Sequence, residues 1–256
     1  SDIRMAMLRT DEVQILYPGE VSPRYVPLIE RSPTLRLERL PGALIDLLQF
    51  NIVKPPYDNK ALRLAIAHAI DREKFIKVNF SGTGEPSFTA IGVGWARNPD
   101  LRPVPFDLNK TRQYLAQAGY PTQGARIPIG CPSTGGYFER CEIHLALLRE
   151  AGFVPDVTVI LAADYFSVTA GFRSRIGFGT TAFAWRGEPA LMVNYMGHSK
   201  DGYPALLGWP PNPTLDSLID EAGAVYDVAK AKPLYDRIQT IMAEEAYYVF
   251  TAWGDR

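Results

Sequence analysis

Residues 131–137 form the first of two short loops that are suited to bind a small molecule. They read Cys-Pro-Ser-Thr-Gly-Gly-Tyr and lie between a predicted strand and a predicted helix. Ser133, Thr134 and Tyr137 offer hydroxyl groups and an aromatic ring beside the N–H groups of a helix N-terminus, where a negative group is stabilised. The pattern favours hydrogen bonding to a ligand rather than bond breaking.

Residues 185–189 form the second loop, Trp-Arg-Gly-Glu-Pro, which follows a predicted strand over 176–185. Trp185 can stack on a ligand or fill an interface between two lobes. Arg186 offers a planar fork for a carboxylate or a phosphate, unless it pairs with Glu188 or another acid. These three side chains are the remaining candidates for ligand contact.

No sequence motif for catalysis accompanies the two loops. The chain has no G-x-S-x-G, G-x-x-x-x-G-K-[ST] or H-E-x-x-H pattern. Its paired acids are neighbours in sequence, so on a helix the two members of each pair point in different directions. We therefore expect no catalytic residue and no enzymatic activity, and keep an α/β hydrolase with an unrecognised site as the alternative.

Cysteine and histidine chemistry is concentrated in one segment. Cys141 and His144 are three residues apart on a predicted helix, and Cys131 ends the strand before it. Three such ligands would suit zinc, but a helix face with a partly buried histidine explains the same spacing, so no metal or other cofactor is expected. The two cysteines either pair, as in exported proteins, or fill separate core positions, and the sequence leaves both open.

The composition limits the classes of partner. The 256 residues carry a formal net charge of −1, which gives no electrostatic reason to expect nucleic-acid binding. No apolar run approaches the ~20 residues that span a bilayer. The first residues predict a helix rather than an export signal. We expect one large domain or two small ones, with no nucleic-acid partner and no direct membrane insertion.

The elements that position the two loops alternate between strands and helices. Strands over 126–131 and 154–161 flank a helix over 138–151, which predicts a β-α-β unit with parallel strands. Other short apolar or alternating runs predict strands over 13–17, 35–40, 44–51 and 247–252. Capping residues and helical spacing predict helices that start at 107 or 109, at 164, at 214 and at Pro233. The pattern is that of a mixed α/β fold.

Residues 55–76 carry the most distinctive pattern, PPYDNKALRLAIAHAIDREKFI. The two prolines mark an extended lead-in, Asp58 or Asn59 can cap a first helix, and Asp71 can cap a second. This run resembles the signature of the family-5 extracellular solute-binding proteins, which deliver peptides, nickel chelates, opines and sugars to ABC importers. Segments over 107–120 and 212–222 resemble later parts of the same family, so the resemblance runs in order along most of the chain.

The resemblance implies a fold, a location and a partner. The fold would be α/β, a lobe of the periplasmic-binding-protein type (class II, cluster C) with a mixed sheet flanked by helices. Residues 1–43 would be the end of a first lobe and the crossover, and residues 44–256 the second, C-terminal, ligand-binding lobe of a longer receptor. Such a receptor captures a small solute between its lobes in the periplasm, or outside the cell when tethered to a membrane, and delivers it to an ABC-transporter permease.

The resemblance also places the solute at the two loops, with departures. In peptide-binding members a Trp-x-x-Asp loop holds the amino terminus of the ligand; here Trp185 is followed by Arg186 and Gly187, and the next acid is Glu188. The first loop often carries an arginine for a carboxylate, and this chain has Thr134 and Gly135 there. We therefore expect a solute other than an ordinary peptide, with an acidic group that Arg186 reads.

Overall fold

A single mixed β-sheet forms the centre of the molecule in the computed structural model, which describes residues 2–16, 25–38, 44–167, 169–185 and 187–254. Within them the strand order is β2-β6-β1-β5-β3-β4. The strands are β1 (Leu44–Phe50), β2 (Glu85–Pro86), β3 (Ala125–Pro132), β4 (Phe153–Ile160), β5 (Phe178–Ala184) and β6 (Tyr248–Gly254). β3 is parallel to β4 and β5, whereas β1 is antiparallel to β5 and β6. The predicted mixed sheet and its parallel β-α-β unit are confirmed.

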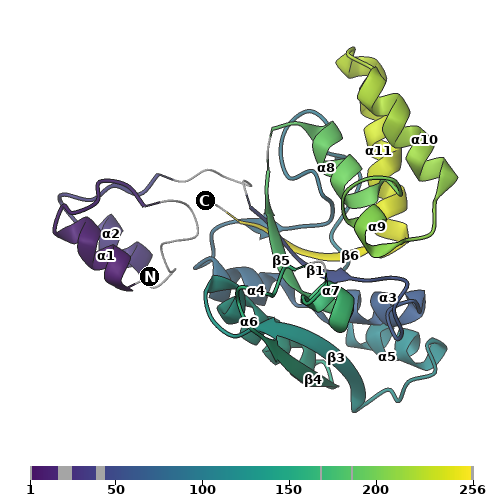
Figure 1. Ribbon diagram of the computed structural model, residues 1–256, viewed down its shortest axis with the longest axis horizontal. Coiled ribbons are helices and arrows are strands. Elements are labelled where there is room, and N and C mark those ends of the chain that lie inside the picture. Colours follow the sequence, from purple (N-terminus) through teal and green to yellow (C-terminus); the bar gives the residue numbers. More distant parts are fainter. Residues whose placement is uncertain (1, 17–24, 39–43, 168, 186, 255–256) are drawn as a thin grey trace.

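Helices cover both faces of this sheet (Figure 1). They are α1 (Asp2–Arg9), α2 (Val26–Glu30), α3 (Lys60–Ala69), α4 (Arg72–Asn79), α5 (Leu108–Gln117), α6 (Gly136–Glu150), α7 (Phe172–Arg175), α8 (Pro189–Gly197), α9 (Gly202–Leu207), α10 (Pro213–Ala224) and α11 (Val228–Glu244). Leu48 and Phe50 of β1 pack in the cluster of α3–α6, whereas Ile45 and Leu47 pack in the cluster of α8, α10 and α11. Alternate residues of one central strand thus serve two apolar cores.

The helix pair α3–α4 forms as its sequence predicts. The side-chain oxygen of Asn59 accepts hydrogen bonds from the N–H groups of Ala61 (3.0 Å) and Leu62 (3.4 Å), and Asp71 accepts one from Lys74 (3.0 Å). These contacts satisfy N–H groups that have no partner within their helix. Asn59 rather than Asp58 is therefore the first cap.

Two buried arginines of this helix pair bind the main chain. The guanidinium of Arg63 donates to four carbonyl oxygens, those of Tyr57, Asp58, Glu245 and Ala246. That of Arg72 also donates to four, those of Ala67, Ile70, Val104 and Phe250. Because the acceptors come from distant segments, each arginine joins α3 or α4 to the chain around α11 and β6.

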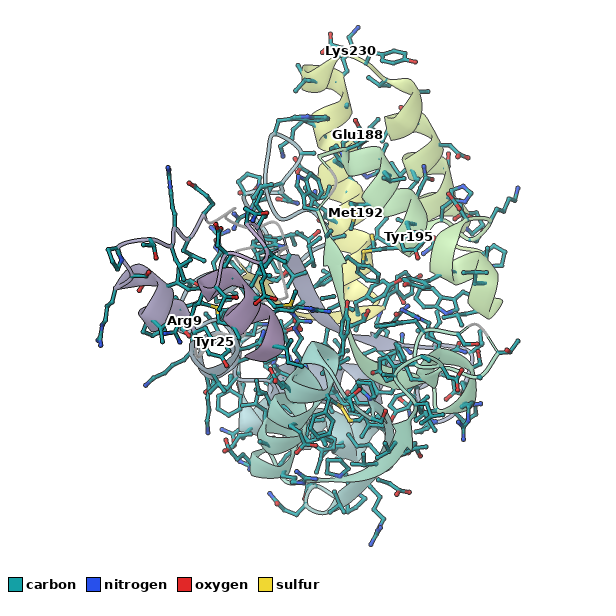
Figure 2. The ribbon with its side chains drawn as sticks, turned by 60° about the vertical axis from the view of Figure 1, so that its left-hand side comes forward. Arg9, Tyr25, Glu188, Met192, Tyr195 and Lys230 are labelled. Atoms are coloured by element: carbon teal, nitrogen blue, oxygen red, sulfur yellow. A yellow bond between two sulfur atoms is a disulfide. The ribbon has the colours of Figure 1, made fainter. Side chains whose placement is uncertain are left out.

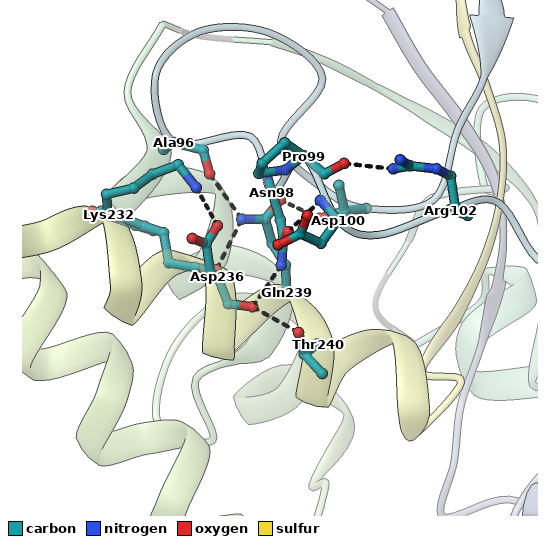
Figure 3. Close-up of polar contacts among 11 residues, drawn as sticks. Ala96, Asn98, Pro99, Asp100, Arg102, Lys232, Asp236, Gln239 and Thr240 are labelled. Carbon is teal, nitrogen blue, oxygen red and sulfur yellow. Dashed lines mark hydrogen bonds and ion pairs between the residues drawn. The ribbon is translucent and has the colours of Figure 1, made fainter.

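The irregular segment between α4 and α5 is held against α11 (Figure 3). The side-chain amide of Gln239 donates to the carbonyl of Ala96 (2.8 Å) and accepts from the N–H of Asn98 (3.2 Å). Asn98 in turn donates to the carbonyl of Asp236 (3.1 Å). Main-chain groups of a loop without regular structure are thereby satisfied by a buried side chain.

Several sequence-based elements are wrong. Residues 13–16 and 35–38 are not strands, and the rest of those two predicted strands lies outside the described residues. No helix follows Asp164 directly, because the segment turns until α7 begins at Phe172. Pro233 does not open the last helix, since Asp227 caps α11 and the proline lies inside it. Helices α8 and α9 were not predicted.

Both edges of the sheet are short or interrupted. β2 has two residues and includes Pro86, and β4 at the other edge includes Pro155. Helices α1 and α2 lie to one side of the sheet and its covering helices (Figure 1). The division of the chain at residues 43 and 44 stays a prediction, and residues 39–43 lie outside the described part.

Candidate ligand-binding site

The two predicted loops leave the sheet at the carboxyl ends of β3 and β5. We call this end of the sheet the loop-bearing edge, as distinct from the lateral edges formed by β2 and β4. β3 and β5 are parallel neighbours, with Gly130 opposite Gly179, so their carboxyl ends lie together. Leu44, the first residue of β1, pairs with both Ala184 at the end of β5 and Gly254 at the end of β6. The edge that carries the loops is therefore also the edge where the chain enters and leaves the sheet.

The first loop is held by polar contacts to its neighbours. The hydroxyl oxygen of Ser133 accepts a hydrogen bond from the N–H of Ala162 (3.1 Å), and the main chain of Ser133 donates to the carbonyl of Ile160 (2.8 Å). Thr134 is exposed. The hydroxyl of Tyr137 donates to the carbonyl of Ala182 on β5 (3.4 Å), which brings this loop to the strand that leads to the second loop.

The second loop is described except for one residue. Trp185 is half-buried and packs against the cluster of α8, α10 and α11. Glu188 is exposed and caps α8, where its carboxylate accepts a hydrogen bond from the N–H of Ala190 (3.1 Å). Glu188, Met192 and Tyr195 follow one another along α8 (Figure 2). Arg186 lies outside the described residues.

The spacing of Glu188 bears on how the second loop is interpreted. It is the third residue after Trp185, which is the position of the acid in a Trp-x-x-Asp loop. A glutamate there reaches one methylene further than an aspartate. In the first loop, Tyr137 is joined to Ala182 of β5, which lies three residues before Trp185.

A buried ion pair lies beside Tyr137, and no sequence pattern predicts it. Asp46 on β1 is fully buried, with one carboxylate oxygen 2.9 Å from Nε of Arg140 on α6 and the other accepting from Thr251 (3.3 Å). Burial raises the pKa of Asp46 to about 7, against the lowering effect of Arg140. The Arg140 guanidinium also lies 5.1 Å from the centre of the Tyr137 ring, so the pair supports a predicted ligand contact.

Cys131 and Cys141 form a disulfide, which settles the choice that the sequence left open. The bond ties the end of β3 to α6 on either side of the first loop. His144 accepts or donates at Nδ1 with Thr180 (3.2 Å), and burial lowers its pKa to about 3, so it is neutral. The two thiolates needed for the zinc alternative are thus consumed, and no cluster of three metal-ligating side chains occurs among the described residues.

A separate cavity of about 550 Å³ lies near the β2 edge. Its lining includes Glu85, Phe88, Arg97 and Arg102, and none of the predicted ligand contacts. Arg97 already forms an ion pair with Glu85 (3.0 Å) and lies 4.1 Å from the ring of Trp253. Arg97 and Glu85 therefore satisfy one another, Arg102 donates to the carbonyls of Pro99 and Leu101, and we do not assign a ligand to this cavity.

The fold is that of an α/β lobe whose two candidate loops lie at one end of the sheet. The family model described as bacterial extracellular solute-binding proteins, family 5 Middle, matches residues 1–171. The chain belongs to this family of extracellular solute-binding proteins. No helix in the described part is both long and apolar enough to cross a membrane.

Individual relatives agree with this assignment. The glutathione-binding protein GsiB of Escherichia coli (strain K12) is 24% identical over 255 residues, which are 97% of this chain and 49% of that protein. The periplasmic binding protein DppA from Helicobacter pylori, in complex with the peptide STSA, matches with a TM-score of 0.84 at 23% identity, over 100% of this chain and 50% of that one.

A third relative is the dipeptide-binding protein from Pseudoalteromonas sp. SM9913 in complex with Met-Leu. It matches with a TM-score of 0.85 at 21% identity, over 100% of this chain and 51% of that one. At such identities the two solved structures are evidence for the fold. The chain spans about half the length of the curated relatives it matches.

Proposed function

We propose that this chain is the solute-binding second lobe of an ABC-importer receptor, and that it closes on a small solute together with a first lobe. The observation that carries the proposal is the common edge: the loops after β3 and β5 lie where the chain enters at Leu44 and leaves at Gly254. The first lobe, connected through the chain at these two points, would complete a pocket at that edge. Rotation of the two lobes about the connecting segments would open and close the pocket.

The receptor would work by binding alone. Closure around the solute shifts the population toward a form that an ABC-transporter permease recognises, in the periplasm or at the outer surface of a membrane. GsiB and the solved relatives are named as binding proteins. That naming supports a receptor over the hydrolase alternative.

The solute that we propose is small and acidic, and differs from an ordinary peptide. Ser133, Thr134 and Tyr137 would supply hydrogen bonds from one side, and Trp185 a stacking surface from the other. Two departures support this choice. The first loop carries no arginine, and the acid of the second loop is a glutamate already engaged as the cap of α8. Arg186 would read the acidic group. The match to glutathione-binding relatives is consistent with a modified peptide.

A thermal-unfolding screen of the full-length receptor tests the proposal. Probes are reduced glutathione, Met-Leu, a sugar, an opine and a nickel–histidine chelate. A ligand at 100 times its Kd stabilises the native state by about 2.7 kcal/mol and raises Tm by several degrees. Residues 1–256 alone should show no shift, because the site is half complete.

Variants separate the site from the rest of the lobe. Trp185→Ala should abolish the shift of the best probe, whereas Tyr226→Ala, at an exposed position between α10 and α11, should leave it unchanged. Arg186→Ala should weaken an acidic probe only. Turnover of any substrate by residues 1–256, or a full-length receptor that responds to no probe, would contradict the proposal.

A further inference from the structure

Arg173 is a buried arginine that the main chain does not satisfy. Three arginines among the described residues are buried: Arg63, Arg72 and Arg173. The first two each donate to four carbonyl oxygens. Arg173 donates to two neutral side-chain atoms, Oε1 of Gln49 (2.7 Å) and the hydroxyl of Tyr203 (2.8 Å). Its guanidinium therefore retains donor capacity.

The surroundings of Arg173 contain no opposite charge. No carboxylate of the described residues lies within ion-pair distance of it, and the titratable groups that act on it are tyrosines: Tyr203, Tyr248, Tyr195 and Tyr165. Burial lowers the pKa of Arg173 because it disfavours the charged form. A buried charge is ordinarily paired with a counter-charge. The Asp46–Arg140 pair across the sheet meets that rule, and Arg173 does not.

The guanidinium of Arg173 lies one aromatic layer behind the candidate site. It is 5.3 Å from the ring centre of Phe166, which is 4.9 Å from the ring of Tyr137 in the first loop. The Phe166 side chain is 39% exposed. On the other side, the Tyr203 ring contacts Phe183, two residues before Trp185, at 5.5 Å. Aromatic contacts thus connect both loops to the guanidinium of Arg173.

We propose that Arg173 and the hydroxyl of Tyr203 form a subsite for a carboxylate of the solute, which reaches the guanidinium past Phe166. The inference rests on the proposed receptor function and adds Arg173 to Arg186 as a second cation that recognises the acidic solute. The planar fork of arginine can bind two carboxylate oxygens at once. The bound anion would supply the counter-charge that the described protein residues do not.

A comparison of acids with their amides tests the subsite. The affinity of the full-length receptor is measured by calorimetry for glutathione and its glycine amide, and for an opine and its amide. Arg173→Gln should weaken binding of the acids about ten- to hundredfold, the amount of a charge-assisted hydrogen bond, and change binding of the amides less than about threefold. The affinity of Arg173→Lys for the acids should lie between the affinities of the unaltered receptor and of Arg173→Gln.

A matched control lies on the same short helix. Arg175 is exposed, and Arg175→Gln should leave all four affinities unchanged. If Arg173→Gln does not fold, Arg173→Lys and Tyr203→Phe carry the same comparison, since each keeps most of the packing. Thermal unfolding without ligand identifies that case.

Three results would overturn the inference. An equal loss of affinity for acids and amides in Arg173→Gln would assign Arg173 a purely structural role. Equal binding of acids and amides by the unaltered receptor would show that no cation reads the carboxylate, while the receptor function stands. No binding of any probe would overturn the receptor function and the subsite together.

Discussion

The buried arginines of α3–α4 and the buried arginine of α7 differ in what their guanidinium groups bind within the protein. Arg63 and Arg72 each donate to four main-chain carbonyls, some of them from distant parts of the chain. Arg173 donates to no main-chain carbonyl of the described residues; it has two neutral side-chain acceptors and several aromatic neighbours. An arginine held by four carbonyls joins parts of the fold and keeps fewer donors for a ligand than Arg173 does.

The comparison separates what identifies the chain from what the chain does. The run over 55–76 is the part that resembles the family signature, and its polar residues cap helices and bind carbonyls. The candidate site lies elsewhere, at the ends of β3 and β5. The residues that carry the resemblance and the residues of the candidate site are therefore different sets.

The largest expected effect tests the structural role of Arg72. Arg72→Met should lower the free energy of unfolding by about 3–5 kcal/mol, because four buried carbonyls lose their donor. Arg173→Gln should lower it by less than about 1.5 kcal/mol. Urea unfolding of residues 1–256 measures both, with the exposed Arg149→Met as the control. Equal losses for Arg72 and Arg173 would remove the distinction between the two regions.

The Asp46–Arg140 pair provides a further test, because its contribution to the free energy of unfolding should depend on pH. The pKa of Asp46 rises from 3.8 to about 7 on folding, so the folded state binds the proton more tightly than the unfolded state. Stability should therefore increase as the pH falls from 7 toward 4, by up to about 4 kcal/mol. The Asp46→Asn variant should not show this increase in stability at low pH.

The measurement is the difference in unfolding free energy between the unaltered protein and Asp46→Asn from pH 7.5 to pH 4.5. Asp156→Asn, at an exposed position of β4, should follow the unaltered protein at every pH. A constant difference across the range would show that Asp46 does not titrate with folding.

Removal of the disulfide should lower the free energy of unfolding by less than the loss of Arg72 and by more than the loss of a helix cap. The disulfide closes a loop with a sequence separation of 10 residues, and the chain-entropy model gives about 2–3 kcal/mol for such a loop. The double variant Cys131→Ser, Cys141→Ser should have a free energy of unfolding that is lower by that amount. It should also bind the solute more weakly, because the disulfide holds both ends of the first loop in place. Dithiothreitol should have the same effect on the unaltered protein and none on the variant. Unchanged stability after reduction would contradict the prediction.

The smallest effects come from two helix caps, one in each region. Asn59→Ala should lower the free energy of unfolding by about 1 kcal/mol, since two N–H groups of α3 lose their acceptor, and should leave solute affinity unchanged. Glu188→Gln keeps an acceptor for the N–H of Ala190 and should affect affinity more than stability. Denaturation and calorimetry on the full-length receptor provide the two measurements. The opposite pattern would assign Glu188 to structure alone.

Local patterns predicted the parts of the fold that depend on local contacts. The caps at Asp71 and Asp107 and the β3–α6–β4 unit follow from residues within a few positions of one another. Residues 35–38 alternate apolar and polar side chains but pair with no strand among the described residues, and an alternating pattern alone does not form a sheet. Pro233 predicts a helix start, yet Asp227 caps α11 six residues before it, and the buried Tyr235 packs the later part of the helix against the core.

The candidate site was predictable only in part for the same reason. Ser133 and Tyr137 could be placed at a strand end from the local pattern, and the structure brings them to the predicted edge. Arg140 and Arg173 were missed, because their partners Asp46 and Gln49 are far away in sequence; Gln49 and Arg173 are 124 residues apart. An arginine followed by ordinary helix residues carries no local sign of such a contact.

The outer edges of the sheet have a consequence for the protein in concentrated solution. β2 and β4 each include a proline, which offers no N–H to an incoming strand, and each proline stands beside an acid, Glu85 or Asp156. Strand-by-strand growth from one molecule to the next is disfavoured at both margins. The chain is in this way discouraged from polymerising through its own backbone.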